Sequence, residues 1–283
     1  MNYRHGFHAG NFADVFKHAL LARLILYLTR KETPFRIIDT HAGEGAYDLS
    51  ADEAERTGEW RFGVGRLADL SAADAATREL LAPYLDLVGA RDAEGRPRLY
   101  PGSPLIATRL LRAQDRAIFC ELRGDAFSAL QSRFARDKRV KTIHLDGYLG
   151  LSAFVPPKER RGLVLVDPPF EQRDEAERML QGFLDAYRKW PTGIYALWLP
   201  IKDDALSRSF VERLRARGVN RILRLDLSVG GTTEDQKLRR TSLVVVNPPF
   251  TLEQEARVLG AFLAERLAQG PGAGFEIEDV SAE

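Results

Sequence analysis

Short apolar runs alternate with longer segments of helical periodicity along most of the chain. The clearest run, residues 163–166 (Leu-Val-Leu-Val), contains no polar residue and is followed by an acid and two prolines. Such a run is typical of a strand buried on both faces, as in a parallel sheet. Similar runs predict further strands at residues 35–38, 117–121, 141–145, 194–199, 223–227 and 243–246. Strands that alternate with helices in this way predict an α/β fold.

The strongest helical pattern follows Asn11, a residue type that often caps a helix N-terminus. Apolar residues recur at helical spacing from Phe12 to about residue 30, which predicts an amphipathic helix. Lys17 and His18 fall off this apolar stripe. A histidine in such a position is more often structural than functional, so His18 by itself indicates no site.

Length and composition limit the class of protein. A chain of 283 residues can hold one large α/β domain, or one domain that carries an insertion. The formal net charge of +1 restricts any nucleic-acid surface to a local patch. The single cysteine, Cys120, excludes an internal disulfide, and the five scattered histidines form no metal-binding pattern. With no signal peptide and no apolar run of about 18 residues, we expect a cytoplasmic protein.

The first predicted strand ends at Asp39, and His41, Gly43 and Gly45 follow within six residues. A strand, an acid and closely spaced glycines are how a doubly wound sheet opens a nucleotide-sized site. The third glycine and the immediate helix of a dinucleotide fingerprint are missing, which counts against NAD.

The next 50 residues interrupt this pattern. Residues 50–99 are rich in alanine, glutamate and arginine and have helical periodicity, so we predict a helical insertion there. Residues 1–49 and 100–283 then form the main domain, which resumes where Ser103, followed by Pro104, predicts a helix cap. Seven arginines of the insertion could cover a substrate or form an ordinary solvated surface. They are Arg56, Arg61, Arg66, Arg78, Arg91, Arg96 and Arg98.

Acidic residues end four successive predicted strands, at Asp39, Glu121, Asp146 and Asp167. The carboxyl ends of parallel strands lie at one edge of a sheet, where ligands bind. We therefore expect these four acids to line a single crevice.

The fourth strand runs into Asp167, Pro168, Pro169 and Phe170. Two prolines stiffen the chain and leave the Pro168 carbonyl as an acceptor beside the Asp167 carboxylate. Two acceptors next to the Phe170 ring suit a planar heterocycle that carries an amino group. The alternative is that the prolines only terminate the strand.

A second segment of the same design, Asn247-Pro248-Pro249-Phe250, competes for this role. It follows the last of the predicted strands, some 80 residues after Asp167. We interpret it as a structural segment after a strand at the edge of the sheet.

A cofactor with ribose and adenine but no phosphate needs acids rather than a phosphate-binding loop, and no Gly-x-x-x-x-Gly-Lys-Ser/Thr motif is present. S-adenosylmethionine fits this requirement. Hydrogen bonds from an adenine amine to Asp167 and the Pro168 carbonyl would favour the tetrahedral nitrogen that attacks the methyl carbon, and the sequence leaves open whether Asp167 or water takes the proton.

The chain resembles the RlmJ family, the bacterial 23S ribosomal RNA adenine-N6 methyltransferases. The stretches that carry the resemblance are residues 3–18, 39–47, 54–59, 100–107, 145–147, 160–170, 192–200 and 246–250 (YRHGFHAGNFADVFKH, DTHAGEGAY, AERTGE, YPGSPLIA, LDG, RRGLVLVDPPF, TGIYALWLP and VNPPF). The resemblance implies a class I, Rossmann-like methyltransferase fold with an inserted helical subdomain. It also implies methyl transfer from S-adenosylmethionine to one adenine of free or partly assembled 23S rRNA, leaving S-adenosylhomocysteine.

The resemblance further implies roles for individual residues. Tyr3, His5 and Lys17 would meet the RNA or close over the site, and the hydrogen-bonding and stacking argument above gives Asp167, Pro168 and Phe170 as the catalytic residues. The cofactor contacts would be His18, His41, Gly43, Ser103, Glu121, Asp146, Gly147 and Asp167. Phe170 stands where many relatives have tyrosine, so stacking is retained without a hydroxyl.

Several alternatives stay open. The same acceptors would serve an amino methyltransferase that acts on DNA adenine, DNA cytosine or a protein glutamine, and a relative without catalysis could simply bind RNA. Arg4, His5, the insertion and residues 237–240 are candidate RNA surfaces or ordinary solvated ones. We expect a monomer that needs no metal.

Overall fold

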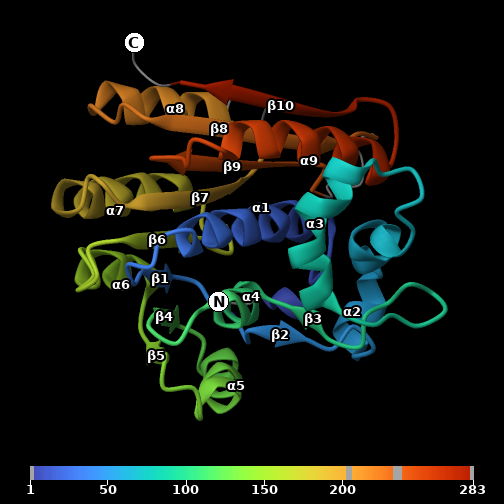
Figure 1. Ribbon diagram of the computed structural model, residues 1–283, viewed down its shortest axis with the longest axis horizontal. Coiled ribbons are helices and arrows are strands. Elements are labelled where there is room, and N and C mark those ends of the chain that lie inside the picture. Colours follow the sequence, from blue (N-terminus) through green and yellow to red (C-terminus); the bar gives the residue numbers. More distant parts are fainter. Residues whose placement is uncertain (1–2, 202–205, 232–237, 281–283) are drawn as a thin grey trace.

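The computed structural model describes residues 3–201, 206–231 and 238–280, and within them an eight-stranded sheet forms the centre of the molecule (Figure 1). The strand order is β10-β8-β9-β7-β6-β1-β4-β5. All seven predicted strands are present. The strands are β1 (Arg36–Asp39), β4 (Arg116–Glu121), β5 (Val140–His144), β6 (Gly162–Val166), β7 (Ile194–Pro200), β8 (Ile222–Val229), β9 (Arg240–Val246) and the unpredicted β10 (Ala273–Asp279).

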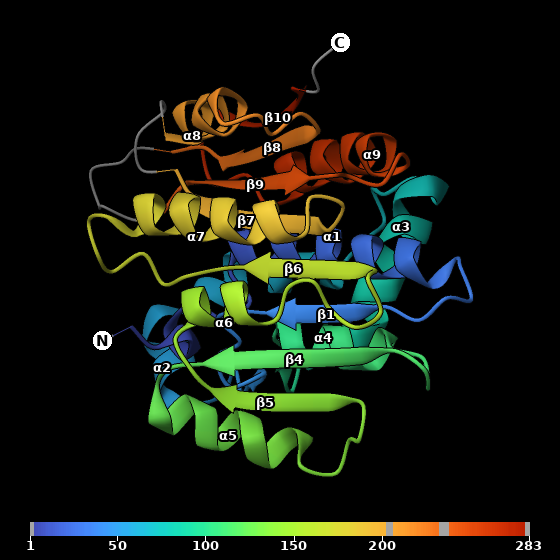
Figure 2. The same ribbon diagram turned by 90° about the vertical axis from the view of Figure 1, so that its left-hand side faces the viewer.

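Five neighbouring strands, β5, β4, β1, β6 and β7, are parallel, and β1 lies in the middle of them between β4 and β6. The chain therefore winds outwards in one direction through β4 and β5 and in the other through β6 and β7 (Figure 2). Ligands of doubly wound sheets bind where the winding reverses, at the carboxyl ends of such strands. Here that position is the gap between the ends of β1 and β6.

Helices cover both faces of the sheet, as the unbroken apolar strands predict. In β6, Leu163 and Leu165 face a core shared with α1, whereas Val164 and Val166 face a second core shared with α7. The longer helices that contribute to the first core are α1 (Phe12–Thr29), α3 (Ala75–Val88), α4 (Ser103–Leu110), α5 (Gly124–Phe134) and α9 (Leu252–Arg266). Those that contribute to the second are α6 (Gly147–Ala153), α7 (Glu175–Lys189) and α8 (Leu206–Ala216).

Helix α1 begins as predicted, since the Asn11 side chain accepts a hydrogen bond from the Asp14 amide. The expectation of an amphipathic helix is wrong. The helix contacts β6, β8 and β9 on one side and α3, α4 and α9 on others, so that even Lys17 and His18 are buried. Polar residues that the sequence pattern assigns to a solvent face are instead enclosed in the protein.

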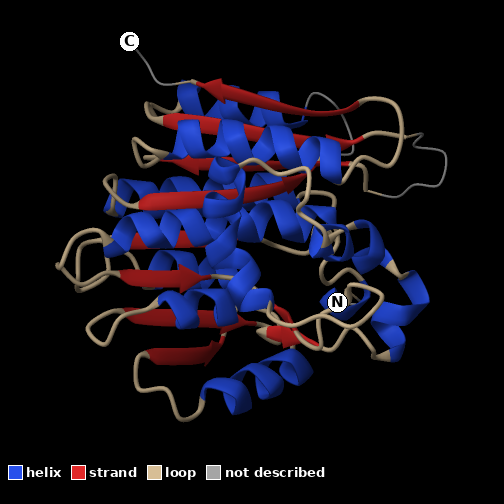
Figure 3. Cartoon of the chain, turned by 45° about the vertical axis from the view of Figure 1, so that its right-hand side comes forward, coloured by secondary structure: helices blue, strands red, loops and turns tan. Residues whose placement is uncertain are grey.

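Residues 50–99 lie at one side of the sheet (Figures 1 and 3). They form helix α2 (Asp52–Thr57), the short 3-10 helices η2 (Glu59–Phe62) and η3 (Val64–Ala68), and α3. Strands β2 (Ala46–Tyr47) and β3 (Tyr100–Pro101) pair with each other at the two ends of this region. Trp60, Leu81 and Tyr84 share the core of α1, so the region packs continuously with the main sheet. That it is a separate subdomain stays a prediction.

Ser103 does not cap a helix. The N-cap of α4 is Gly102, and Ser103 is the first helical residue, with Pro104 beside it in the first turn as predicted. The Ser103 hydroxyl is turned to β1, where it donates a 2.7 Å hydrogen bond to the Asp39 carboxylate.

The second Pro-Pro segment follows β9, which is not an edge strand. It lies between β7 and β8 and is antiparallel to both. Asn247 therefore lies at the end of the sheet where the parallel strands begin, whereas Asp167 lies at the end where they finish. The Asn247 amide donates to the carbonyls of Pro191 and Gly193 at 2.8 and 2.7 Å, and its backbone φ is 53°. These contacts support the structural interpretation, although the predicted edge position was wrong.

Replacing Asn247 with alanine should therefore lower the free energy of unfolding by about 1–3 kcal/mol, because two hydrogen bonds are lost and alanine disfavours a positive φ. Asn247→Gly is the matched control, since glycine tolerates this φ and only the hydrogen bonds are lost. Urea unfolding measures both variants. An alanine variant as stable as the wild-type protein would contradict the structural role.

Asp39, the last residue of β1, is almost fully buried (1% exposed). Its carboxylate accepts hydrogen bonds from the Ser103 hydroxyl and from the His41 amide. Burial raises the pKa of Asp39 to about 7, although the Ser103 hydrogen bond opposes the shift. The folded protein therefore holds a proton here over a pH range in which the unfolded chain has released it.

This raised pKa predicts a pH-dependent stability difference between the wild-type protein and Asp39→Asn. The stabilising contribution of protonated Asp39 is complete below about pH 4 and is lost as the pH rises through about 7. The wild-type protein should thus lose about 2–4 kcal/mol relative to the asparagine variant between pH 4 and pH 8. Urea unfolding across this range measures the difference, in which the titration of other groups cancels. Parallel pH profiles would show that Asp39 is charged in the folded state.

Candidate active site

A cavity of about 470 Å³ opens at the carboxyl ends of β1, β4, β6 and β7. The volume suits a small-molecule site. Every predicted site residue lies on its wall: Tyr3, His5, Lys17, His18, His41, Gly43, Ser103, Glu121, Asp146, Gly147, Asp167, Pro168 and Phe170. Of the four strand-end acids, three line the cavity, and Asp39 is buried behind it.

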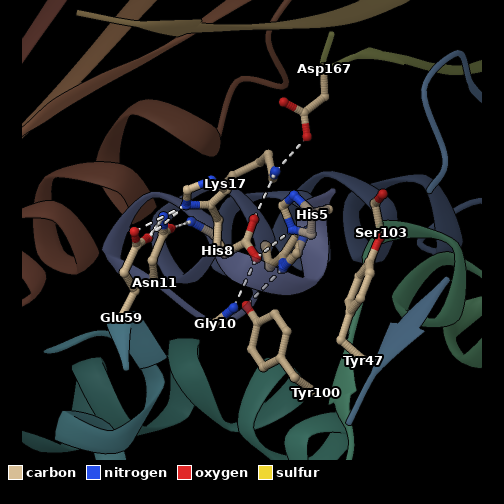
Figure 4. A network of polar contacts seen from close by, with 12 residues as sticks. His5, His8, Gly10, Asn11, Lys17, Tyr47, Glu59, Tyr100, Ser103 and Asp167 are labelled. Carbon is tan, nitrogen blue, oxygen red and sulfur yellow. Dashed lines mark hydrogen bonds and ion pairs between the residues drawn. The ribbon is translucent and has the colours of Figure 1, made fainter. Parts of the chain in front are cut away.

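An ion-pair chain joins α1 to the end of β6 (Figure 4). The Lys17 ammonium donates to Oδ2 of Asp167 and pairs with Oδ1 of Asp14 at 3.0 Å. Asp14 Oδ2 in turn lies 2.9 Å from Nε2 of His5 and accepts a 3.0 Å hydrogen bond from the Gly10 amide. The side chains of Lys17 and Asp14 are 4% and 2% exposed, whereas that of Asp167 is 15% exposed at the cavity.

Neighbouring charges favour the charged forms of the buried Lys17 and Asp14. Burial opposes the charged form of Lys17, but Asp14 and Asp167 outweigh it and raise the pKa of the ammonium above the usual value for lysine. Burial also opposes the charge on Asp14, yet His5 and Lys17 hold the pKa of its carboxyl well below the usual range. A buried charge with partners on both sides is stable in this way, and losing one partner leaves the other uncompensated.

The loop after β1 is fitted to Glu121 at the end of β4. One carboxylate oxygen accepts a 2.8 Å hydrogen bond from the Gly43 amide, and the other accepts a 2.7 Å hydrogen bond from the Arg123 amide. Gly43 has a φ of 58°, and a side chain there would collide with the Tyr47 hydroxyl. The glycine thus brings a backbone amide to the acid, which keeps free lone pairs for a ligand.

Asp146 and Gly147 begin helix α6. The Asp146 carboxylate caps this helix by accepting from the amides of Tyr148 and Leu149 at 2.8 and 3.3 Å. A Cβ at Gly147 would lie 2.3 Å from the Thr40 carbonyl and 2.6 Å from the His41 ring. Packing is therefore already a sufficient reason for glycine at this position. Burial lowers the pKa of His41 to about 4, which keeps the ring neutral near pH 7.

His18 sits deeper, with 1% of its surface exposed. Its Nδ1 is 2.8 Å from the Tyr100 hydroxyl, which is 3.1 Å from that of Tyr84. Burial lowers the pKa of His18 to about 3, so this ring is also neutral near pH 7.

Phe170 and Trp198 form the aromatic part of the wall, with ring centroids 5.8 Å apart and an interplanar angle of 72°. Phe170 has a φ of 49°, which a bulky residue rarely adopts. In the second Pro-Pro segment it is Asn247 that has the positive φ, and Phe250 is 80% exposed. The two tetrapeptides are similar in sequence but differ in backbone conformation.

The sequence did not reveal Asp14 or Trp198 as parts of the site. Asp14 lies one helical turn before Lys17 in a mostly apolar helix, and such an (i, i+3) acid–base pair is a signal that could have found it. Trp198 lies near the end of β7, next to β6, so its position in the sheet was its only signal.

Most arginines of the insertion bond within the protein. Arg61 pairs with Glu55, Arg96 pairs with Glu55 and Asp92, and Arg91 donates to the Val64 carbonyl. Arg66 and Arg78 also donate to backbone carbonyls. Of the two alternatives left open by the sequence, these contacts favour an ordinary structural surface over cover of a substrate. In the segment 237–240, Lys237 lies outside the described residues.

None of the described helices is long and apolar enough to cross a membrane. No group of three or more His, Cys, Asp or Glu side chains in the described part of the chain is arranged to hold a metal ion.

The chain is similar to known proteins along nearly its whole length. The model of the family described as "Ribosomal RNA large subunit methyltransferase D, RlmJ" matches residues 32–278. Two proteins named "Ribosomal RNA large subunit methyltransferase J" are similar. The one from Haemophilus influenzae is 37% identical over the full length of both chains, and the one from Escherichia coli K12 is 39% identical over 94% of each.

The fold has a close counterpart among solved structures. A crystal structure of a Legionella pneumophila protein superposes with a TM-score of 0.84 at 32% identity, covering 97% of this chain and 99% of that one. With the strand order described above, this confirms the predicted α/β, Rossmann-like fold class. Because the family model and the two named relatives match most of its length, the chain belongs to the RlmJ family of ribosomal RNA large subunit methyltransferases.

Proposed function

We propose that this protein transfers a methyl group from S-adenosylmethionine to N6 of one adenine in 23S rRNA and releases S-adenosylhomocysteine. The observation that carries the proposal is the Asp167 carboxylate, which ends the fourth parallel strand on the wall of the cavity beside Phe170. Family membership gives the class of substrate. We place the reaction in the cytoplasm, on free or partly assembled rRNA, with a monomer as the working form.

The donors and acceptors around the cavity fit the cofactor. Glu121 is the last residue of β4, the strand next to β1, where ribose hydroxyls are bound in such sheets, and its two oxygens are already oriented by backbone amides. Asp146, Gly147 and His41 form the adjoining wall, and the Gly43 loop, Ser103 and His18 form the rest. When bound, S-adenosylmethionine supplies an electrophilic methyl group on a sulfonium.

Asp167 then orients the adenine amine. Its Oδ2 is held by Lys17, so Oδ1 is the oxygen that accepts a hydrogen bond from the amine, and the Pro168 carbonyl accepts the second. The Phe170 ring holds the plane of the base. Alignment of the nitrogen with the methyl carbon can supply ~7–11 kcal/mol of the rate acceleration in well-oriented cases.

The N-terminal residues help to close the site. The Tyr3 amide donates to Glu171, its carbonyl accepts from Arg123, and its hydroxyl is 2.7 Å from Nδ1 of His5. Tyr3 therefore spans the cavity between the ends of β4 and β6. We propose that Tyr3 and His5 contact the flipped or unpaired adenosine. Lys17 is buried and acts only through its ion pair with Asp167.

Asp167→Ala should lower the rate of methyl transfer to protein-free 23S rRNA by about 10²–10⁴-fold, because the amine loses its acceptor. Binding of the RNA should change little. Transfer of a tritiated methyl group measures the rate, and a filter-binding assay measures the affinity. Asp167→Asn is a second variant and should lose a similar amount of activity, because the Lys17 ammonium takes its one amide oxygen and the amide NH2 is left facing the amine.

Asn247→Ala is the matched control, since it truncates the equivalent residue of the other Pro-Pro segment and should keep the wild-type rate while folded. A folded Asp167→Ala protein with normal turnover would remove the catalytic role of Asp167. If the wild-type protein instead methylates DNA or a glutamine-containing peptide, the amino methyltransferase reading stands with another substrate. Tight RNA binding with no transfer to any of these would indicate a non-catalytic relative.

A further inference from the structure

Three buried side chains form a hydrogen-bonded row that leads from the region of residues 50–99 to the cavity. Tyr84 comes from α3, Tyr100 from β3 and His18 from α1. Both tyrosines are fully buried, and the three groups are joined at 3.1 Å (Tyr84 hydroxyl to Tyr100 hydroxyl) and 2.8 Å (Tyr100 hydroxyl to His18 Nδ1).

The direction of this row follows from counting donors. Among the described residues, the Tyr84 hydroxyl has Tyr100 as its one hydrogen-bond partner. If Tyr84 donates to Tyr100 and Tyr100 donates to Nδ1 of His18, both hydroxyl protons are used. In the reverse direction the Tyr84 proton has no acceptor, and an unsatisfied buried donor costs about 1–3 kcal/mol. The forward direction is therefore the stable one.

The forward direction determines the state of the histidine. Burial keeps His18 neutral, so only one ring nitrogen carries a proton. Since Nδ1 accepts from Tyr100, the proton is on Nε2. No described residue is hydrogen-bonded to Nε2, and His18 lines the cavity. The ring thus presents an unused N–H donor on a wall that is otherwise rich in carboxylates.

We propose that Tyr100, supported by Tyr84, is a positioning residue that fixes His18 in the Nε2–H tautomer, so that His18 donates a hydrogen bond to the carboxylate of the methionine end of the cofactor. This inference rests on the proposed function. The carboxylate is the one anionic group of S-adenosylmethionine, and the strand-end acids cannot bind it. It needs donors, and a tautomer fixed in advance supplies one without reorganisation on binding.

The direct test is the tautomer of His18 in the ligand-free protein, read from the imidazole nitrogen shifts of ¹⁵N-histidine-labelled samples. His18→Gln assigns the signal. The wild-type protein should show the Nε2–H form, and Tyr100→Phe should show a mixture of tautomers or the Nδ1–H form. Tyr195→Phe is the matched control, because it removes another buried hydroxyl, bonded to the Trp190 carbonyl, in the other core.

The second test is calorimetric binding of S-adenosylhomocysteine. Tyr100→Phe should weaken binding about 5- to 20-fold, Tyr84→Phe should weaken it less, and Tyr195→Phe should leave it unchanged. In the His18→Gln background, whose amide offers a donor whatever its neighbour, Tyr100→Phe should have no further effect. In turnover, Tyr100→Phe should raise KM for S-adenosylmethionine and change kcat little, because the carboxylate is remote from the reacting atoms.

An Nδ1–H tautomer in the wild-type protein would overturn the inference. So would equal losses of affinity in the Tyr100 and Tyr195 variants, or an undiminished effect of Tyr100→Phe in the His18→Gln background. Failure of the proposed function is recognised separately, because a wild-type protein that binds no S-adenosylhomocysteine removes the cofactor whatever the tautomer is. The tautomer measurement in the free protein still decides whether the tyrosines fix the ring.

Discussion

The ammonium group of Lys17, buried between the carboxylates of Asp14 and Asp167, is the interaction on which the arrangement of the site depends. It ties the first turns of α1 to the end of β6, elements about 150 residues apart in the sequence. Desolvation makes such a charge costly, and two carboxylates offset the cost only while both stay in place. The position of the Asp167 oxygen that faces the cavity is therefore set by the packing of a helix, and not only by the two prolines that follow it.

The sequence predicts the sheet side of this arrangement well, because parallel strands leave a strong local signal. Leu163 to Val166 read as a strand buried on both faces, and the acids that end successive strands necessarily come to one edge. The helix side could not be predicted in the same way. Lys17 and His18 lie off the apolar stripe, and both are covered by residues distant in the sequence: Asp167 and Trp198 contact Lys17, and Tyr100 contacts His18. Periodicity describes one helix against one surface, whereas α1 has partners on several sides.

The two Pro-Pro segments show a similar limit. Their residue types differ only at the first position, yet one follows a parallel strand and the other an antiparallel strand, so they lie at opposite edges of the sheet. The direction of β9 depends on its insertion between β7 and β8, which no local pattern encodes. In the sequence, the two segments were distinguished by their place in the order of predicted strands. That reasoning assigned the structural role to the Asn247 segment, which its contacts support, although the predicted position of its strand at the edge of the sheet was wrong.

The charges on the cavity wall constrain what can enter it. Among the described residues, seven carboxylate residues line the cavity, against three lysine or arginine residues. The acids are Asp14, Glu44, Glu121, Asp146, Asp167, Glu171 and Glu175, and the bases are Lys17, Arg123 and Arg178. An excess of negative charge favours a cationic cofactor and opposes a phosphate group. The phosphate backbone of an RNA strand must then stay outside the cavity, and only a neutral base can enter it. A flipped or unpaired adenosine meets this requirement. The formal net charge of only +1 is consistent with this arrangement. Positive charge that attracts RNA is needed at the rim of the cavity, whereas inside the cavity it would oppose binding of the cationic cofactor.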